Sequence, residues 1–484
     1  MEEKTQEVKK TENKVSLWVC ITIIIFFAGS FIFELIVWGT PNVHMTLIFS
    51  SAFAVILLLT QGVKMSTVEE GVIHGTKIAT ISMMILMLVG VMIPAWTGSG
   101  TIPVLIYYGL KVISPSIFLL ACVVICALAC LCTGTSWGTI ATFGVAMMGI
   151  GHGLGVPEAW TAGAVISGSL FGDTMTPVSD FANLASGSCE VDLFKHIKGM
   201  FCITVPSLVI SLAAALVMGL KFSSNTYDAS SVDTIMSGIE VNFNISPLYA
   251  IISMVPVAII LILSIKKVNA MCVMVVSSIA AMLIAVIFQG YSLQDMVSFM
   301  NDGFSIDTGY ESLDTIFNRG GLQSMMYTVS IGYLGLSFAG ILEKSGVMDT
   351  LLHCVSGVTR NIRNLVLTQA ATGCIVALIS ASDYVSVLVQ GRMFAKGYDE
   401  LGISRTVLSR TCLSCGAVFG WLFPWTVGGA YVSGALGLSP TSYGMFAFYI
   451  FLILIINIIY AVFGIFLPKA SKEEVEMRDS LEKI

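Results

Sequence analysis

The chain has 484 residues, of which 56% are hydrophobic and only 11% charged, and its mean hydropathy is +0.89. Soluble domains carry about 25% charged residues, so the composition excludes an ordinary soluble protein and predicts an all-α polytopic membrane protein. The formal net charge of −6 comes without any basic stripe interleaved with aromatic residues. We therefore expect the bilayer, and not a nucleic acid, as the macromolecular environment of this protein.

A series of apolar stretches follows along the chain. A membrane span needs about 20 residues and several stretches are shorter, so we expect roughly eleven to thirteen crossings together with re-entrant or interrupted helices. The first stretch contains Glu34 and continues past it, which favours a retained span over a signal peptide. The stretches lie near residues 15–38, 43–60, 72–96, 115–133, 137–155, 158–172, 199–220, 246–264, 270–288, 324–342, 365–381, 384–395, 405–423 and 442–467.

An internal repeat is the most informative pattern in these stretches. The run Gly-Thr-Ser-Trp-Gly-Thr at residues 134–139 has a counterpart 247 positions later, at 381–386, which reads Ala-Ser-Asp-Tyr-Val-Ser. The match predicts two inverted repeats whose helices break in the same two places, as in secondary transporters that bind substrate and ions near the bilayer midplane. The same offset places Gly144 on Gly391, Pro177 on Pro424, Ser179 on Thr426 and Gly187 on Gly434.

The repeat and the apolar stretches together predict the organisation of the chain. We expect an N-terminal tail and leading spans over 1–62, and a first transport repeat over 65–220. Linker spans and polar segments occupy 221–323, a second transport repeat covers 324–467, and a C-terminal tail follows over 468–484.

The first polar patch within the apolar stretches spans residues 133–144. Its hydroxyl groups, on Thr135, Ser136 and Thr139, lie in a glycine-spaced segment. Hydroxyls and freed backbone carbonyls are hard oxygen ligands suited to Na+. The alternative is close helix packing through Gly134 and Gly138, because small residues four apart also serve that purpose.

The second patch carries two acids seven residues apart, Asp173 and Asp180, with the helix-breaking Pro177 between them. A carboxylate at the bilayer centre costs several kcal/mol, so it lines a wet cavity, pairs with a cation or takes a proton. A surface loop with ordinary acids is the alternative, and the flanking apolar runs disfavour it. We predict a Na+ site at Thr135, Ser136 and Asp180. Further candidate ion or substrate ligands in this patch are Thr176, Ser179 and Asn183.

The third and fourth patches are the repeat partners of the first two. Asp383 is the lone carboxylate between Leu365 and Phe394, which makes it a candidate coupling residue. The alternative is a salt bridge from Asp383 to Arg392 or Lys396.

The neighbouring Ser382 is a candidate ligand. The fourth patch has Thr426 and a second helix-breaking proline, Pro424, but no acid. The aromatic residues Trp137, Tyr384 and Trp425 are candidates for packing against a small organic substrate, or else belong to the aromatic belts at the membrane interface.

The sequence contains little that indicates a cofactor or an enzyme. Cys412 and Cys415 form a CxxC pair, but no second CxxC or histidine cluster completes a metal site, so we expect two small residues on one helical face. No assembled nucleophile and base indicate catalysis. We therefore expect a transporter with no cofactor.

The strings GTSWGT (134–139), FGDTMTPVSD (171–180) and FPWTVGGAY (423–431) resemble the NhaC family of Na+/H+ antiporters, whose relatives include malate/lactate exchangers and amino-acid carriers. The resemblance implies an inverted-repeat fold of the ion-transporter superfamily in the cell membrane, with Na+ as coupling ion and a homodimeric assembly. It also implies that Asp173 and Asp180 are the leading ion- or proton-linked residues.

The chain departs from the family pattern in its second half. The segment 412–416 has no acidic pair, and the acid of 382–384 appears shifted by one position. Na+/H+ antiport is the leading hypothesis. The alternative is a Na+-coupled symporter or exchanger of an amino acid or a small carboxylate such as malate or lactate.

Overall fold

The computed structural model describes residues 15–38, 42–222, 229–266, 268–355, 361–471 and 474. Its contacts divide the chain into two compact units, each described by itself below. The first unit comprises Met1–Ala79 with Tyr333–Val358, and the second comprises Thr80–Gly332 with Thr359–Ile484.

Helices make up the described structure. The first series is α1 (Leu17–Trp38), α2 (Val43–Thr60), α3 (Met65–Gly98), α4 (Thr101–Val112), α5 (Pro115–Thr133), α6 (Ser136–Thr139), the π-helical segment η1 (Ile140–Gly144), α7 (Val145–Gly153), α8 (Glu158–Met175), α9 (Asp180–Ser188) and α10 (Leu193–Phe222). The middle series is α11 (Ala229–Asn242), α12 (Pro247–Ser253), α13 (Val255–Ile265), α14 (Ala270–Ile284), the π-helical η2 (Ala285–Gln289), α15 (Leu293–Asp302), α16 (Glu311–Phe317), α17 (Leu322–Lys344) and α18 (Val347–Val355). The last series is α19 (Ile362–Ser380), α20 (Asp383–Glu400), α21 (Arg405–Cys412), the π-helical η4 (Leu413–Ala417), α22 (Val418–Gly420), α23 (Val427–Leu436), α24 (Pro440–Tyr443), the 3-10 segment η5 (Gly444–Phe446) and α25 (Phe448–Phe463).

Nine helices among the described residues are long and apolar enough to cross a membrane, and one bent pair, Pro440–Phe446 with Phe448–Phe463, brings the number to ten. The protein is therefore an all-α, multi-pass membrane protein. The number falls below the eleven to thirteen crossings expected from sequence. The stretches near 137–155, 158–172, 384–395 and 405–423 form α6–α7, α8, α20 and α21–α22, and each of these adjoins a helix break.

In the first unit, α3 and α17 cross with their backbones in close contact. A Cβ atom on Gly75 would lie 1.9 Å from the carbonyl oxygen of Leu336, and one on Gly340 would lie 2.1 Å from that of Gly71. Small residues at such a crossing allow the close helix approach that drives association in a bilayer, where lipid tails are as apolar as leucine.

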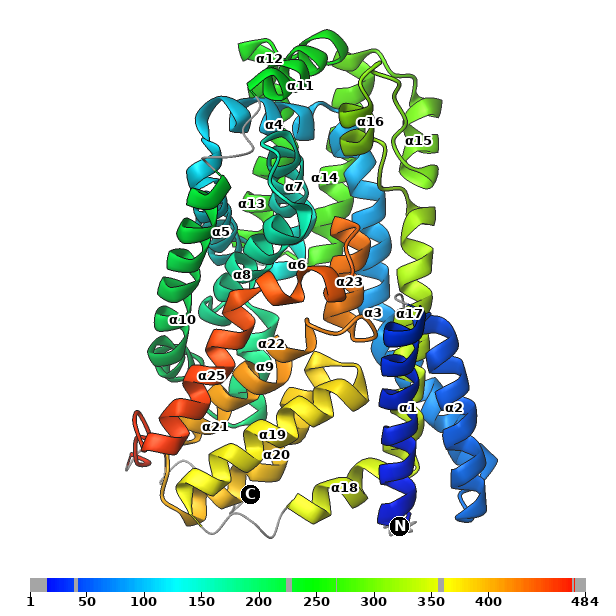
Figure 1. The fold of residues 1–484 in the computed structure, drawn as a ribbon, viewed down its shortest axis with the longest axis vertical. Coiled ribbons are helices and arrows are strands. Elements are labelled where there is room, and N and C mark those ends of the chain that lie inside the picture. Colours follow the sequence, from blue (N-terminus) through cyan, green and yellow to red (C-terminus); the bar gives the residue numbers. More distant parts are fainter. Residues whose placement is uncertain are drawn as a thin grey trace, which may run out of the picture. The chain divides into compact units, whose positions relative to one another are not determined.

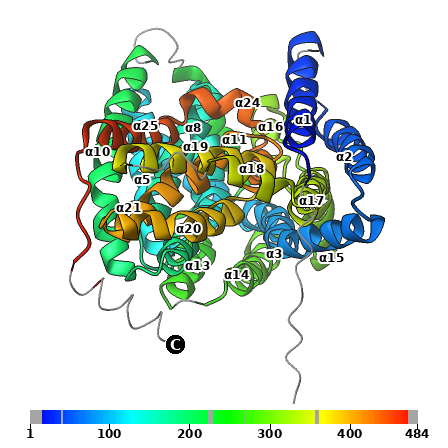
Figure 2. The ribbon, with the colours of Figure 1, turned by 90° about the horizontal axis from the view of Figure 1, so that it is seen from below.

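The second unit contains two helical hairpins, seen in Figure 1 with α19 and α20 in the lower part of this unit and α5 and α7 in its upper part. The first hairpin joins α5 to α6 through Gly134, which has a φ of 79°. The second joins α19 to α20 through Ala381, which has a φ of 50°. The two halves of the second hairpin run alongside each other in Figure 2. The chain thus reverses direction at two positions that are 247 residues apart.

Each hairpin is followed by a broken helix. The first helix breaks between α8 and α9, and the second breaks between α22 and α23. Pro177 lies in the first break and Pro424 in the second, where the missing N–H of proline cannot continue a helical ladder. The side chains of Ser179 and Thr426, also 247 residues apart, accept hydrogen bonds from the first turn of the helix that resumes. Equivalent sequence positions therefore end and restart the helices in both halves.

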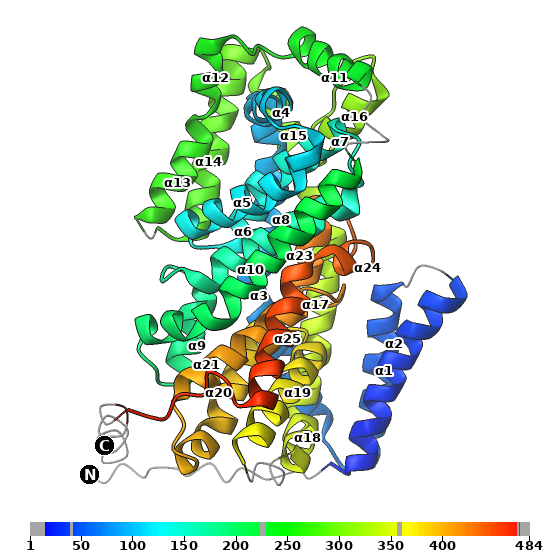
Figure 3. The same ribbon diagram turned by 60° about the vertical axis from the view of Figure 1, so that its left-hand side comes forward.

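Outside the repeats, α13 and α14 pack as an antiparallel pair (Figure 3). The indole N–H of Trp96 on α3 donates a hydrogen bond to the Ser277 hydroxyl of α14 at 3.0 Å, which links this pair to α3. The polar segment that follows forms the amphipathic α15 and the short α16.

Glycines on α8 let this helix pack tightly against α5. A Cβ atom on Gly172 would lie 2.4 Å from the Cβ of Cys130 and 2.9 Å from the Ala127 carbonyl oxygen. We expect Gly172→Ala to lower stability by about 1–3 kcal/mol, the usual cost of overpacking. Gly187→Ala on α9, where nothing lies within 4 Å of the added Cβ, is the matched control. The apparent melting temperature of the two purified variants in detergent checks the prediction, and equal values would contradict it.

Candidate functional site

Asp173 lies in the last turn of α8 and is buried, with only 2% of its surface exposed. Its Oδ2 accepts hydrogen bonds from the backbone N–H of Ser136, at 3.1 Å, and from the Ser136 hydroxyl. Its Oδ1 accepts a third hydrogen bond from the Ser179 hydroxyl at 2.6 Å. One carboxylate therefore connects the tip of the first hairpin to the break in the following helix.

The two serines are placed there by the helix breaks themselves. Ser136 is the first residue of α6, and the Ser179 side chain accepts from the N–H groups of Phe181 and Ala182 at 3.1 and 3.3 Å as the N-cap of α9. Helix N-termini present unpaired N–H groups and a partial positive charge, which stabilise an anion. The local fold thus supports a negative charge on Asp173 in a buried position.

Threonine oxygens surround the hairpin tip next to this acid. The Thr139 hydroxyl donates to the Thr135 carbonyl oxygen at 3.0 Å and lies 3.2 Å from the Thr133 hydroxyl. The Thr176 hydroxyl donates to the Leu131 carbonyl oxygen at 3.3 Å. Carboxylate, hydroxyl and carbonyl oxygens are the donors that hard cations prefer, so the chemistry of this group fits Na+.

Asp180 and Asn183 are placed differently from the sequence prediction. Asp180 is exposed in the first turn of α9, and within the described part of the chain no hydrogen bond joins it to Thr135 or Ser136. Asn183 donates to the carbonyl oxygens of Pro177 and Ser179 at 3.0 and 2.7 Å, so its amide stabilises the break. The Na+ group of Thr135, Ser136 and Asp180 stays a prediction, and among the described residues Asp173 is the acid that contacts Ser136.

Asp383 begins α20 and is completely buried. Neither of its carboxylate oxygens has a hydrogen-bond partner among the described residues. The salt bridge to Arg392 or Lys396 considered from sequence does not form, and Lys396 instead lies 3.9 Å from Glu400. Asp383 is thus a buried acid with unmet polar requirements, in contrast to Asp173.

The two predicted hydroxyl ligands in the second half act as helix caps. The Ser382 hydroxyl accepts from the Val385 N–H at 3.3 Å. The Thr426 hydroxyl accepts from the Gly429 N–H at 3.2 Å and donates to the Gly420 carbonyl oxygen at 2.6 Å. Both groups hold the second hairpin and the second break in shape next to Asp383.

The predicted aromatic residues pack against protein groups. The ring of Trp137 lies 4.2 Å from that of Tyr431 and 5.7 Å from that of Trp421, and the Tyr431 hydroxyl donates to the Trp137 carbonyl oxygen. The Trp425 indole N–H donates to the Leu378 carbonyl oxygen at 3.0 Å. Tyr431 was not among the predicted site residues, although its place in the string 423–431 was the available signal.

Tyr384, the third predicted aromatic residue, is the second residue of α20. Its ring stacks on the ring of Phe181 of α9, with the two ring centroids 5.0 Å apart. Of the three predicted coupling acids, Asp173 is the one held by hydrogen bonds among the described residues.

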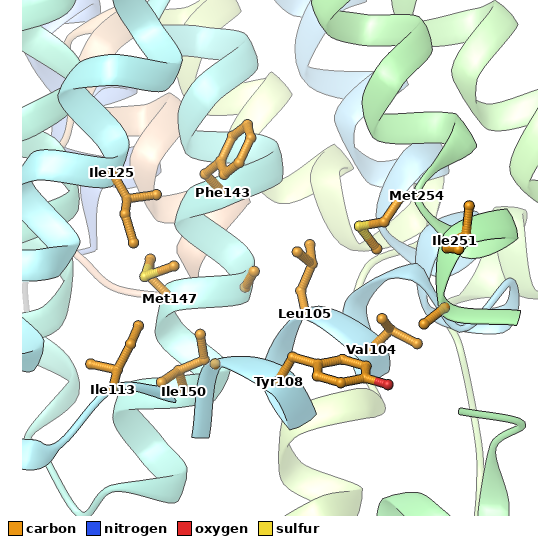
Figure 4. A pocket seen from close by; sticks show the side chains of 13 residues that line it. Val104, Leu105, Tyr108, Ile113, Ile125, Phe143, Met147, Ile150, Ile251 and Met254 are labelled. Carbon is orange, nitrogen blue, oxygen red and sulfur yellow. The ribbon is translucent and has the colours of Figure 1, made fainter. Parts of the chain in front are cut away.

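Figure 4 shows a cavity of about 480 Å³ that lies elsewhere in the second unit. Its thirteen lining residues come from α4, α5, η1, α7 and the α12–α13 junction, and none of them is a predicted site residue. They are almost entirely apolar, and Tyr108, Met147 and Met254 are examples. This cavity lacks the polar groups that a cation requires.

The cysteine pair gives no sign of a metal centre. No group of three or more His, Cys, Asp or Glu residues suited to a metal ion occurs in the part of the chain that the structure describes. The Cys412 sulfur lies 3.7 Å from that of Cys189, and the Cys415 sulfur accepts from the Asn457 amide at 3.7 Å. Both thiols are buried among helices.

Comparisons with known proteins place the chain among membrane transporters. Residues 168–465 match the model of the Na+/H+ antiporter family, and residues 1–220 match that of the C4-dicarboxylate anaerobic carrier. The solved structure of MtrF from Neisseria gonorrhoeae aligns with a TM-score of only 0.36 and 12% identity over 93% of this chain and 95% of its own, so it says nothing about substrate here.

Several curated relatives align over most of their length. The Na+/H+ antiporter NhaC of Alkalihalophilus pseudofirmus is 35% identical over 79% of this chain and 82% of its own. The malate-2H+/Na+-lactate antiporter of Bacillus subtilis is 33% identical over 83% and 85%, and the arginine/ornithine antiporter ArcD of Halobacterium salinarum is 30% identical over 77% of both chains. Because the family model covers more than half of the chain and these relatives align with over three quarters of it, the protein belongs to the NhaC-type Na+/H+ antiporter family.

Proposed function

We propose that this protein exchanges Na+ for H+ across the cell membrane, and that the two cations compete for the carboxylate of Asp173. The observation that carries the proposal is the position of this acid, which is buried and connects the tip of the first hairpin to the break between α8 and α9. A buried carboxylate needs a cation, a proton or strong donors, and an antiporter uses the first two in turn.

The groups around Asp173 suit the binding of Na+. The hydroxyls of Ser136 and Ser179 donate to the carboxylate here, but a hydroxyl can rotate its proton away and offer a lone pair to a cation. The Thr135 carbonyl oxygen, at the hairpin tip, is a further candidate ligand. When a proton neutralises Asp173, the attraction for Na+ is lost, so each cation excludes the other.

The same contacts couple the bound cation to the protein conformation. Asp173 belongs to α8, Ser136 to the hairpin and Ser179 to the restart of α9, so the state of one carboxylate affects three chain segments. Discontinuous helices at the midplane of secondary transporters serve this purpose in alternating access. We infer that exchange of the cation changes how firmly the hairpin tip is held.

The proposal includes three further points. The protein acts as a transporter and not as an enzyme, Na+ is its coupling ion, and it requires no cofactor. It assembles as a homodimer, which light scattering coupled to size-exclusion chromatography will test directly. A mass of one chain after subtraction of the detergent would contradict the dimer and would leave the transport proposal intact.

The test of the function is Na+-driven proton movement in proteoliposomes of the purified protein. An inward Na+ gradient should drive proton efflux from the lumen without any organic solute, and protein-free liposomes should show none. Absence of proton movement at any Na+ gradient would contradict the proposal.

A second candidate function is Na+-coupled exchange of a small organic anion or amino acid. The observation that favours it is the buried aromatic cluster of Trp137, Trp421 and Tyr431, whose rings offer apolar surface to an organic solute. In addition, two relatives in the same family are named for organic solutes. Addition of malate, lactate, arginine and ornithine to the same liposomes separates the two functions. Na+ uptake that requires one of these solutes supports exchange of that solute, and uptake that ignores them all excludes these four.

A further inference from the structure

The repeat places a different pair of residues at the junction of hairpin and broken helix in each half. The offset of 247 positions equates Ser136 with Asp383 and Asp173 with Gly420. In the first half the hairpin supplies the hydroxyl and the helix supplies the acid. In the second half the hairpin supplies the acid and the helix supplies a glycine. The carboxylate therefore lies on the broken helix in the first repeat and on the hairpin in the second repeat.

The geometry shows that positions 383 and 420 face the same space. A Cβ atom on Gly420 would lie 2.1 Å from Oδ1 of Asp383 and 3.3 Å from its Cγ. These separations are well inside van der Waals contact, so the carboxylate of Asp383 occupies the volume into which a side chain at 420 would extend. A side chain at 420 would have to displace the Asp383 carboxylate, so the glycine leaves room for an acid that comes from the other side of the junction.

The two acids differ in how they are satisfied. Asp173 accepts three hydrogen bonds, whereas neither oxygen of Asp383 accepts one from the described residues. The indole N–H of Trp421, which follows Gly420 in the second break, is also buried without a partner among those residues. A buried and unpartnered carboxylate is strongly unfavourable, so this junction lacks a positively charged partner.

No described cation of the protein fills that role. Arg392 and Lys396 lie on α20 roughly 13 and 20 Å further along the axis at the helical rise per residue. Arg405 of α21 binds Asp399 and Glu190, and Arg410 binds Asn457 and the Phe466 carbonyl oxygen. Arg363, the remaining cation on a helix packed against α20, is exposed in the first turn of α19, at the end of that helix away from Ala381. The other titratable groups on the elements packed around Asp383 are Tyr384, Tyr398, Asp399 and Glu400 on α20, Tyr443 on α24, Asp180 on α9, Cys374 on α19, Cys412 on α21 and Cys415 on η4.

We infer that Asp383 forms a second cation site, in which one monovalent cation, Na+ or H+, neutralises the carboxylate in one half of the transport cycle and is absent in the other half. The inference rests on the proposed function and adds to it: each repeat carries one cation on its own acid. The acid of the first repeat is held by hydrogen bonds, and the acid of the second repeat depends on the cation alone. Exchange of Na+ for H+ on Asp173 is electroneutral, so the net charge moved per turnover depends on Asp383, which carries a cation in only one direction.

The test is the net charge moved per Na+, measured as a reversal potential in proteoliposomes. Fixed Na+ and pH gradients are opposed by a potassium and valinomycin voltage clamp, and the voltage of zero net flux gives the charge ratio. Asp383→Asn should shift this ratio by one charge per turnover. An active Asp383→Asn variant with the wild-type ratio would overturn the inference, because the acid would then be permanently neutral. Asp302→Asn, which removes an exposed acid of α15, controls for the loss of a charge.

A double exchange covers the case in which Asp383→Asn is inactive or does not fold. Asp383→Ser combined with Gly420→Asp gives the second half the same residue pair as Ser136 and Asp173 in the first half. The new carboxylate at 420 lies in the volume that the Asp383 carboxylate occupied. We expect the double variant to transport with the wild-type charge ratio. Asp383→Ser alone should not show the wild-type charge ratio. A double variant that folds but does not transport would overturn the inference.

The outcome is separate from that of the proposed function. The reversal potential can be measured for whichever solute the wild-type protein moves. If Na+-driven proton movement is absent but an organic solute is exchanged, the proposed function fails. The charge ratio of Asp383→Asn, compared with that of the wild type, then still decides the inference. If protons move as proposed and Asp383→Asn keeps the wild-type ratio, the inference alone fails.

Discussion

Asp173→Asn is expected to abolish Na+-dependent transport while leaving a folded protein in the membrane. The amide has nearly the same shape, and its single oxygen can accept from Ser136 while its NH2 group faces the Ser179 hydroxyl as a donor, so the contacts between the hairpin tip and the helix break survive in part. The negative charge is lost, however, and removal of one partner of a buried charge pair costs about 3 kcal/mol or more. Since about 1.4 kcal/mol corresponds to a factor of ten, Na+ affinity should fall by roughly a hundredfold.

Two measurements on the purified variant check this expectation. Initial rates of Na+ uptake into proteoliposomes report transport, and the Na+-dependent rise in melting temperature reports binding without any need for turnover. Wild-type protein should be stabilised by Na+ and Asp173→Asn should not. A variant that binds and transports Na+ as the wild type does would remove Asp173 from the site.

Asp180→Asn is the informative comparison, because both acids were leading candidates from sequence. Asp180 is exposed on α9, and an exposed charge contributes about 1 kcal/mol or less, which corresponds to a loss of roughly fivefold at most. The losses of Na+-dependent transport in the two single variants therefore show which acid contributes more to Na+ binding. A larger loss in Asp180→Asn than in Asp173→Asn would support the Na+ group of Thr135, Ser136 and Asp180 that the sequence predicted.

Gly134→Ala is expected to damage both stability and transport, because the tip of the first hairpin needs a left-handed residue. Gly134 has a φ of 79°, and a side chain in that conformation costs about 1–2 kcal/mol. The added Cβ would also lie 2.7 Å from the Cβ of Val178, in the break between α8 and α9. The clash separates the hairpin tip from the segment that places Ser179, so the Na+ group around Asp173 is disturbed as well.

The second half provides the matched control in Ala381→Gly. Ala381 holds the equivalent position with a φ of 50° and is buried, and its carbonyl oxygen accepts from the Val427 N–H at 2.9 Å. Glycine relieves about 1 kcal/mol of left-handed strain and loses about 0.8 kcal/mol from the buried methyl group, so stability should change little. Melting temperature and Na+ uptake of both variants check the pair, and equal losses would show that the left-handed conformation is not the cause.

The repeat is the part of the fold that the sequence predicted most directly. Prolines, small residues and capping hydroxyls recur at an offset of 247 positions, and the helices break between α8 and α9 and between α22 and α23 at those positions. The reason is local, because Pro177 and Pro424 cannot donate to a helical ladder and Ser179 and Thr426 cap the helix that follows. The domain boundaries assigned from the same repeat stay a prediction.

The number of membrane spans was harder to obtain from composition. Hydropathy counts apolar residues in a window, and it does not show that a polar interruption turns a span into a hairpin half or a broken helix. The stretches near 384–395 and 405–423 contain such interruptions, and their helices adjoin the tip and the break of the second half. The short lengths of these stretches and the repeated prolines and small residues were the signs of this in the sequence.

The amino-acid sequence by itself determined that this is a polytopic membrane protein with two repeats and buried acids, because composition and local breakers act over short distances. Only the tertiary structure decided which acid is buried and which groups contact it. Asp173 and Asp180 are indistinguishable as letters seven residues apart, but the break between them buries the first against Ser136 and leaves the second exposed. The pairing of Asp383 with Gly420 is likewise a long-range contact, and it arises from the packing of a hairpin against a broken helix that no local pattern specifies.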